Sequence, residues 1–174
     1  STTNLDKEQR NYTSAIRSSG NTLLSLIEDI LDISKIEAGK LVSESIPFDL
    51  HTLVFNTARI FSPQVDKKGI KLNCYIDPAV PYRLIGDELH LRQILMNTLS
   101  NAIKFTDQGS VSMEVRLLDD APDDRTWIIF RVIDTGIGMN EEARQKIFGQ
   151  FVQADASVTR KYGGTGLGTS ISKE

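Results

Sequence analysis

The alternation of apolar and polar residues predicts a long helix followed by a unit of mixed helices and strands. Residues 6–40 carry apolar side chains at a near-heptad spacing, which indicates one helix with a broad apolar stripe. The stripe consists of Tyr12, Ile16, Leu23, Leu24, Leu26, Ile27, Ile30, Leu31 and Ile33. A stripe this broad needs more than one partner helix, and Gly39 is a typical helix stop.

After this helix the pattern changes from helical spacing to shorter segments. Residues 43–49, which include Pro47, are expected to be a linker. A short helix over residues 51–62 should end at Pro63. Alternating apolar residues predict strands at residues 70–76 and 111–117, and a more continuously apolar run predicts a third strand at 127–133. The last two should form an antiparallel pair joined through residues 119–125.

Two further helices are predicted around these strands. Asp87 is a plausible N-cap for a strongly periodic helix that carries Asn97, with Glu88 in its first turn. Asn140 should open another helix that runs to about Phe148. Helices and strands therefore alternate irregularly, which predicts an α+β fold with a helical face on a mixed sheet.

Charge and cysteine content narrow the possible functions. The net charge of −3 and the lack of an Arg-rich run argue against nucleic acid as a partner. Cys74 is the only cysteine, so no internal disulfide forms, and its alternation with apolar neighbours indicates a packing role. No apolar run is long enough for a membrane segment, and the first residues are polar. These features predict a cytoplasmic protein.

One stripe of the predicted central helix carries the first candidate site. Asn97, Asn101 and Lys104 lie within roughly 60° of one another on a helix of 3.6 residues per turn. The opposite side carries the apolar residues Leu95, Leu99 and Ala102. Two amides and an ammonium suit a metal–polyphosphate. The alternative is an ordinary amphipathic helix with a solvated polar face.

Two glycine clusters strengthen the first interpretation. Asp134 follows an apolar strand and could accept a hydrogen bond from an exocyclic amine, while Gly136 and Gly138 would let the backbone approach a flat base. A tight turn capped by the aspartate is the alternative. The cluster at residues 163–168 could crowd backbone amides around an anion, or serve as a hinge. The long aperiodic segment 149–164 before it is typical of a lid.

The motifs occur in the order asparagine-bearing helix, strand–aspartate–turn, lid and glycine cluster, and in this order the chain resembles the ATP-binding domain of sensor histidine kinases. That domain belongs to an ATPase superfamily that also includes gyrase, MutL and the ninety-kilodalton chaperones. Residues 97–106 match its asparagine box, 134–139 its first glycine box, 148–151 its phenylalanine box and 163–168 its second glycine box. Residues 25–40 resemble the second helix of the dimerisation hairpin, and the likeness is greatest to hybrid kinases. Thr169, where leucine is usual, should alter packing more than phosphate binding.

The resemblance assigns roles to residues. It implies that Asn101 coordinates Mg²⁺, that Asn97 and Lys104 bind the phosphates, and that Asp134 binds the adenine amine beside Gly136 and Gly138. It also places further ATP-binding residues in the lid and the second glycine box, with the two lid cations as the weaker candidates. These are Phe151, Arg160, Lys161, Gly164, Thr165, Gly166, Leu167 and Gly168.

The resemblance also implies a domain plan and an activity. Residues 1–43 would be the second helix of the dimerisation and phosphotransfer hairpin, and residues 44–174 a catalytic domain with the two-layer α/β sandwich of the Bergerat type. The protein would be a homodimer through the helix at 1–43 that transfers the ATP γ-phosphoryl to a histidine, for relay to an aspartate of a response regulator or receiver domain. The inner membrane is a candidate anchor for a longer parent protein. An ATPase or molecular clamp and a non-catalytic dimerisation fragment are the alternatives.

Asn97 and the histidines separate these alternatives. ATP-hydrolysing relatives have a glutamate where this chain has Asn97, and an amide is no general base, so weak ATP hydrolysis is expected. Neither His51, expected at the surface, nor His90, which could lie near the nucleotide, sits in a phosphoacceptor motif. The chain is therefore expected to start after the acceptor helix. It is also expected to stop before the last strand hairpin of the family, to bind ATP weakly and to self-associate.

Overall fold

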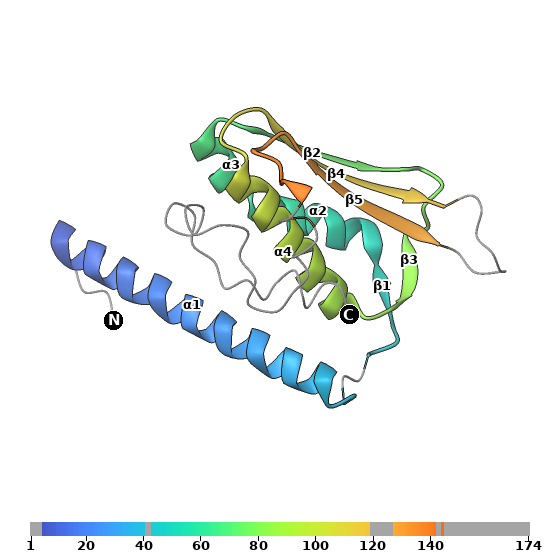
Figure 1. Cartoon of the computed structure of the whole chain (residues 1–174), viewed down its shortest axis with the longest axis horizontal. Helices are drawn as coiled ribbons and strands as arrows, with labels where there is room; N and C mark the ends of the chain where they lie inside the picture. The colour runs from blue at the N-terminus through green and yellow to red at the C-terminus, as the bar shows by residue number, and fades with distance from the viewer. Residues whose placement is uncertain (1–4, 41–42, 119–126, 142–143, 145–174) are drawn as a thin grey trace. The chain divides into compact units, whose positions relative to one another are not determined.

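The computed structural model describes residues 5–40, 43–118, 127–141 and 144. Its elements are labelled in Figure 1. The described residues fall into two compact units, one that contains α1 and one that contains every other element.

The first unit is the helix α1 (Lys7–Glu37), which confirms the helix predicted at the start of the chain. It begins with a reciprocal cap, because Asp6 Oδ1 accepts from the Gln9 N–H at 2.8 Å while Gln9 Oε1 accepts from the Asp6 N–H at 3.1 Å. Gly39 follows the last turn of the helix, and its φ of 62° lets the Lys40 N–H reach back to the Lys35 carbonyl. The described apolar side chains of its stripe are exposed: Tyr12, Ile16, Leu23, Leu24, Ile27, Ile30 and Leu31.

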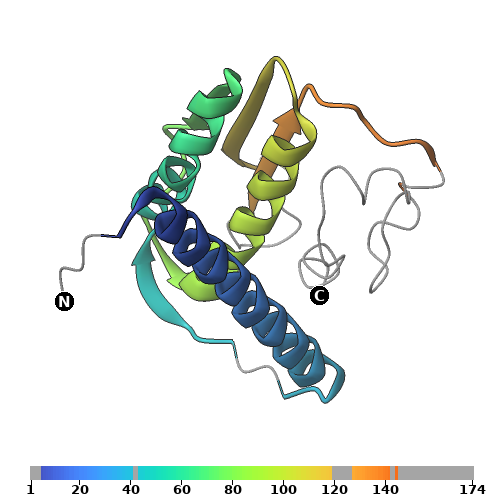
Figure 2. The same ribbon diagram turned by 90° about the vertical axis from the view of Figure 1, so that its left-hand side faces the viewer.

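The second unit contains helices on one face of a mixed sheet, as predicted. Its elements are β1 (Ile46–Asp49), α2 (Leu50–Ile60), α3 (Ser62–Lys68), β2 (Lys71–Ile76), β3 (Arg83–Gly86), α4 (Glu88–Phe105), β4 (Ser110–Leu117) and β5 (Ile128–Asp134). The larger sheet has the order β2-β4-β5, with β2 parallel and β5 antiparallel to β4. Figures 1 and 2 show α2 and α4 side by side along this sheet. This arrangement is the two-layer α+β fold that was expected.

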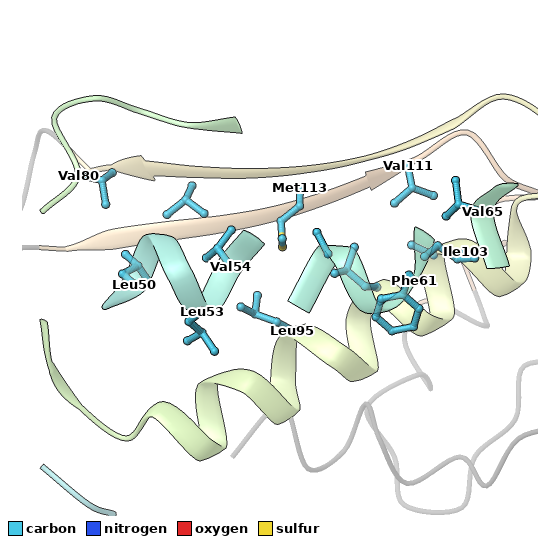
Figure 3. Packing of buried hydrophobic residues seen from close by; sticks show 14 of the residues in the cluster. Leu50, Leu53, Val54, Phe61, Val65, Val80, Leu95, Ile103, Val111 and Met113 are labelled. Atoms are coloured by element: carbon cyan, nitrogen blue, oxygen red, sulfur yellow. The ribbon is translucent and has the colours of Figure 1, made fainter. Parts of the chain in front are cut away.

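The core lies between the helices and the inner face of β4 (Figure 3). Alternate residues of β4 point inward, and all three are fully buried: Val111, Met113 and Val115. They meet fully buried residues of α2 and α4, namely Leu50, Leu53, Val54, Leu95, Leu99 and Ile103. Each side chain of this size contributes about 1.5–3 kcal/mol on burial. Because a shift of one residue would turn β4 inside out, this core fixes the register of the sheet.

Aspartate caps set where the two long helices of this unit begin. Asp49 Oδ1 accepts from the Thr52 N–H at 2.8 Å at the start of α2. Asp87 Oδ1 accepts from the His90 N–H at 2.9 Å at the start of α4, which confirms the predicted N-cap. A second bond, from the Glu44 N–H to Asp87 Oδ2 at 2.8 Å, ties the segment before β1 to the same cap.

Two predictions about prolines are wrong. The expected linker at 43–49 contains strand β1, which pairs antiparallel with β3 so that Pro47 faces Ile85. Proline is tolerated there because an edge strand can spare one N–H. Pro63 was expected to end a helix, but α2 ends at Ile60 and Pro63 lies in the first turn of α3. Proline is tolerated there because the N–H groups of the first helical turn have no acceptor within the helix, so the missing N–H costs no hydrogen bond.

Two other predicted segments are described only in part. Glu141 and Arg144 are helical, and the Arg144 N–H donates to the Asn140 carbonyl at 3.0 Å, as expected for a helix that Asn140 opens. The rest of that helix lies outside the described residues. The antiparallel pairing of β4 with β5 is confirmed, while the connection at 119–125 lies outside the described residues.

Candidate functional site

Helix α4 separates an apolar face from a polar one, as its sequence predicts. Leu95, Leu99 and Ala102 are buried against the core. On the other stripe, Asn97, Asn101 and Lys104 are half-buried. The core contacts therefore fix the rotation of the helix about its axis, and this rotation holds the three polar side chains on one line.

The loop after β5 is packed against the C-terminal end of α4. A Cβ added at Gly136 would collide with the carbonyl oxygen of Phe105, the last residue of α4, and would lie 2.9 Å from Asp134 Oδ1. The next amide, that of Ile137, donates to the same carbonyl at 3.3 Å. Only glycine permits so close an approach, so residue 136 joins the two predicted motifs in space.

Hydrogen bonds within the loop hold its conformation. Asp134 Oδ1 accepts from the Gly136 N–H at 2.9 Å, which makes a local turn. Thr135 pairs with the start of β4: its N–H donates to the Ser110 carbonyl at 3.1 Å, and its Oγ1 accepts from the Ser110 N–H at 3.0 Å. The loop is therefore fixed to strand β4 as well as to helix α4.

Two residues in this arrangement were not predicted from the sequence. Thr135 stood between a candidate aspartate and a candidate glycine without a role of its own. Gly109 has a φ of 102°, and an added Cβ there would collide with Thr135 Oγ1. Its partner is distant in sequence, so only the fold could reveal the pair. Gly138, a predicted site residue, has a φ of 67° and open space around it.

The charges at this end of α4 suit an anion beside a group with an amine. Partial burial lowers the pKa of the Lys104 ammonium, whose Nζ lies 4.8 Å from the centroid of the Phe105 ring. A partly desolvated cation interacts more strongly with an anion than a fully hydrated one does. Asp134 is exposed at the start of the adjoining loop, where its carboxylate can accept hydrogen bonds.

The two histidines lie elsewhere. His90 belongs to the cap of α4, where its Nδ1 lies 2.6 Å from Asp87 Oδ2. The His90 N–H, together with the Glu44 N–H and the His90 ring, lowers the pKa of Asp87 to about 2. The surface position expected for His51 is wrong: its ring is half-buried, stacks on Tyr82 at 3.8 Å and places Nε2 3.2 Å from the Val80 carbonyl.

The rest of the predicted site lies outside the described residues. This applies to the phenylalanine box, the lid cations and the second glycine cluster: Phe151, Arg160, Lys161, Gly164, Thr165, Gly166, Leu167 and Gly168. The described part of the site therefore consists of the stripe on α4 and the Asp134–Gly138 loop. Its donors fit a nucleotide with a cation: carboxamides and an ammonium for phosphate and metal, and a carboxylate with a glycine cradle for a base.

Family comparisons agree with this geometry. The family described as histidine kinase-, DNA gyrase B- and HSP90-like ATPases matches residues 86–174. The phospho-acceptor domain called His Kinase A matches residues 1–39. Because the first match covers half of the chain, the chain belongs to the histidine kinase-, DNA gyrase B- and HSP90-like ATPase family.

Individual relatives extend over almost the whole chain. Hybrid signal transduction histidine kinase L of Dictyostelium discoideum is 46% identical over 172 residues, which are 99% of this chain and 10% of that protein. Signal transduction histidine-protein kinase BarA of Escherichia coli K12 is 41% identical over 174 residues, 99% of this chain and 19% of that protein. The chain thus spans less than a fifth of the length of these curated relatives.

Solved structures show the same fold. Full-length ShkA, crystallised in complex with AMPPNP, aligns with a TM-score of 0.77 and 37% identity over 97% of this chain and 34% of that one. The catalytic domain of histidine kinase ThkA aligns with a TM-score of 0.55 and 27% identity over 74% of this chain and 76% of that one. Among the described residues, no helix combines the length and the apolar character that crossing a bilayer requires.

Proposed function

We propose that this chain binds ATP together with Mg²⁺ and presents the γ-phosphoryl group to a histidine of a partner helix. The observation that carries the proposal is the contact of Gly136 with the Phe105 carbonyl. This contact joins the C-terminal end of α4 to the Asp134 loop, and it supports one site in which groups suited to phosphate lie beside groups suited to adenine. The AMPPNP complex of ShkA supports this interpretation, because that protein shares the fold at 37% identity.

The stripe on α4 is assigned to the phosphates. Asn101 would coordinate Mg²⁺ through its amide oxygen, and Asn97 and Lys104 would bind phosphate oxygens. When bound, Mg²⁺ would neutralise negative charge on the phosphates. The half-buried position of Lys104 favours this role, since its cation gains more from an anion than a solvated lysine would.

The loop after β5 is assigned to adenine. Asp134 would accept a hydrogen bond from the exocyclic amine, while Gly136 and Gly138 would line the base. Asp134 is held for this task, since one of its oxygens already accepts the Gly136 N–H. Outside the described residues, we assign ATP contacts to Phe151, Arg160, Lys161, Gly164, Thr165, Gly166, Leu167 and Gly168.

The acceptor of the phosphoryl group is proposed to be a histidine rather than water. By the family resemblance, Asn97 occupies the position at which ATP-hydrolysing relatives carry a glutamate, and an amide cannot take a proton from water. Catalysis by this chain would therefore consist of positioning and charge neutralisation. The hybrid kinases among the relatives support a relay from that histidine to an aspartate of a receiver domain or response regulator.

The domain plan belongs to the same proposal. Residues 1–43 would form the second helix of a dimerisation hairpin, and residues 44–174 the catalytic domain. The exposed apolar stripe of α1 supports a homodimer through this helix, because a second helical surface would bury it. We place the catalytic domain in the cytoplasm, with the inner membrane as a candidate anchor of a longer parent.

A phosphotransfer assay tests the proposal. The chain is incubated with radiolabelled ATP, Mg²⁺ and a separate protein that carries an acceptor helix. Label on histidine supports the proposal, whereas free phosphate would indicate an ATPase, and the absence of both would indicate a non-catalytic module. Asn101→Ala should abolish Mg²⁺-dependent labelling. Thr98→Ala is the matched control, since Thr98 is exposed on the same helix and its hydroxyl bonds only within that helix in the described structure.

A further inference from the structure

Lys68, the last residue of α3, reaches across to the C-terminal end of α4. Its Nζ donates to three carbonyl oxygens there, those of Ile103 at 2.8 Å, Lys104 at 2.9 Å and Thr106 at 3.1 Å. Asp107 Oδ1 lies 3.6 Å from the same ammonium. A half-buried lysine on a neighbouring helix thus closes the end of the helix that carries the site.

These bonds complete a set. A helix leaves its last carbonyls without partners inside the helix, and they need donors from elsewhere. Thr106 Oγ1 donates to the Ala102 carbonyl at 2.8 Å, and the Ile137 N–H donates to the Phe105 carbonyl at 3.3 Å. Together with the three bonds from Lys68, every carbonyl from residue 102 to residue 106 has a donor. One of these donors belongs to the Asp134–Gly138 loop.

We propose that Lys68 is a positioning residue of the nucleotide site, which holds the last turn of α4 where Lys104 and the Asp134–Gly138 loop can act on one ligand. The inference rests on the proposed function for the identity of that ligand. Lys68 has no place in the sequence motifs, and it acts through the backbone of α4 rather than on the nucleotide.

The geometry explains why this bond set affects position as well as stability. The Lys104 carbonyl is bound by Lys68, while the Lys104 side chain belongs to the polar stripe. The next carbonyl, that of Phe105, packs closely against Gly136 and accepts a hydrogen bond from the Ile137 N–H. A shift of this turn therefore moves the phosphate-binding cation and the base-binding loop relative to each other.

Lys67 supplies a matched control. It precedes Lys68 in the last turn of α3, so both lysines lie near the negative end of that helix's dipole. Lys67 is exposed. Lys67→Met and Lys68→Met therefore make the same substitution and remove the same charge at neighbouring positions. They differ because only Lys68→Met removes the bonds of Lys68 to the carbonyls of α4.

The test measures two properties of the folded 174-residue chain. The first is the amide resonance of Ile137 in the nucleotide-free protein, by ¹⁵N NMR at a temperature where denaturant unfolding shows each variant to be folded. The second is the affinity for AMPPNP with Mg²⁺, by calorimetry at the same temperature. Lys68→Met should displace the Ile137 resonance and weaken the affinity by roughly tenfold, whereas Lys67→Met should change neither.

Each outcome decides something. If Lys68→Met leaves both the Ile137 resonance and the affinity of the wild type unchanged, the inference is overturned. If the wild type binds no AMPPNP, the proposed function fails, and the Ile137 resonance alone decides whether Lys68 sets the loop. If Lys68→Met does not fold, Lys68→Arg decides. Its planar guanidinium cannot place one nitrogen among three carbonyls, so the resonance should move, and an unmoved resonance with unchanged affinity would overturn the inference.

Discussion

Helix α1 and the unit that contains β1 to β5 differ in how far the apolar residues of their periodic patterns are buried. In α1 the described apolar side chains of the stripe are 46–71% exposed. In the α/β unit, the core residues Leu53 and Leu99 are at most 1% exposed. Both segments have a clear periodicity, so the pattern alone does not decide whether a segment can bury its own apolar surface.

The comparison shows what each region needs in order to be stable. The α/β unit covers its sheet with its own helices and can hold a site in fixed geometry. A single helix stabilised by local hydrogen bonds is marginal, and its apolar stripe gains free energy only when another surface covers it. The described α/β unit therefore buries its own core, whereas the apolar stripe of α1 would gain stability from a surface that covers it.

The largest expected effect comes from removing side-chain volume in the two regions. Leu53→Ala should lower the free energy of unfolding of the α/β unit by about 2–5 kcal/mol, because it leaves a cavity among buried residues of α2 and α4. Ile16→Ala, on the exposed stripe of α1, should change it by less than about 0.5 kcal/mol. Urea unfolding followed by tryptophan fluorescence measures both. Equal losses would show that α1 shares the core of the α/β unit.

The contact between the loop and α4 should be the next most sensitive feature. Gly136→Ala should cost about 1–3 kcal/mol, since the new Cβ collides with the Phe105 carbonyl and the loop must move. The same variant should bind AMPPNP more weakly. Gly138→Ala meets no neighbouring atom and should cost about 1 kcal/mol, from its positive φ alone. Thermal unfolding and calorimetry compare the two, and the interpretation of the site fails if Gly136→Ala is the milder substitution.

The cap of α4 should add a pH dependence to the α/β unit. Asp87→Ala should destabilise the protein by about 1 kcal/mol near neutral pH, through loss of the bonds to the His90 and Glu44 amides. The folded-state pKa of Asp87 is about 2, below the ordinary 3.8, so its contribution is fully present above pH 4 and is lost as the pH falls toward 2. Urea unfolding at pH 6 and pH 3 should show a smaller gap between wild type and variant at pH 3. A constant gap would contradict the assignment.

The smallest effect is expected in α1. Gly20 lies inside this helix with nothing within 4 Å of an added Cβ. Gly20→Ala should therefore increase the helix content and stabilise α1 by about 0.5–1 kcal/mol, since alanine loses less backbone entropy than glycine. Circular dichroism at increasing temperature measures this. A loss of helix content would mean that another surface packs closely on Gly20 in solution.

The sequence predicted those elements whose apolar spacing is long and regular. Helix α4, its Asp87 cap and strands β2, β4 and β5 follow directly from their periodicity, as does the polar stripe of Asn97, Asn101 and Lys104. Strands β1 and β3 are too short for a periodic signal, and the prolines near β1 and α3 were interpreted as breaks. A proline excludes a hydrogen bond from its own nitrogen, but it does not exclude the edge strand or helix start that it begins.

Contacts between segments that are distant in the chain could not be predicted from the sequence. The glycine at residue 136 indicated a close approach, but nothing identified the Phe105 carbonyl as the atom approached. Lys68 was less visible still, because its three acceptors are backbone atoms some 35–38 residues away and carry no side-chain signature. A backbone acceptor is available at every residue, so its identity depends on the tertiary structure alone.

The parallel pairing of β2 with β4 has a consequence for how the chain folds. Antiparallel neighbours such as β4 and β5 can be joined by a short connection. The parallel strands β2 and β4 need a longer crossover connection, which here contains β3 and α4. Ordering that crossover has an entropic cost before the strand pairing is gained, and such long-range closure slows folding. Helix α4, which carries Asn97 and Asn101, is thus also part of the connection that must be ordered before β2 can pair with β4.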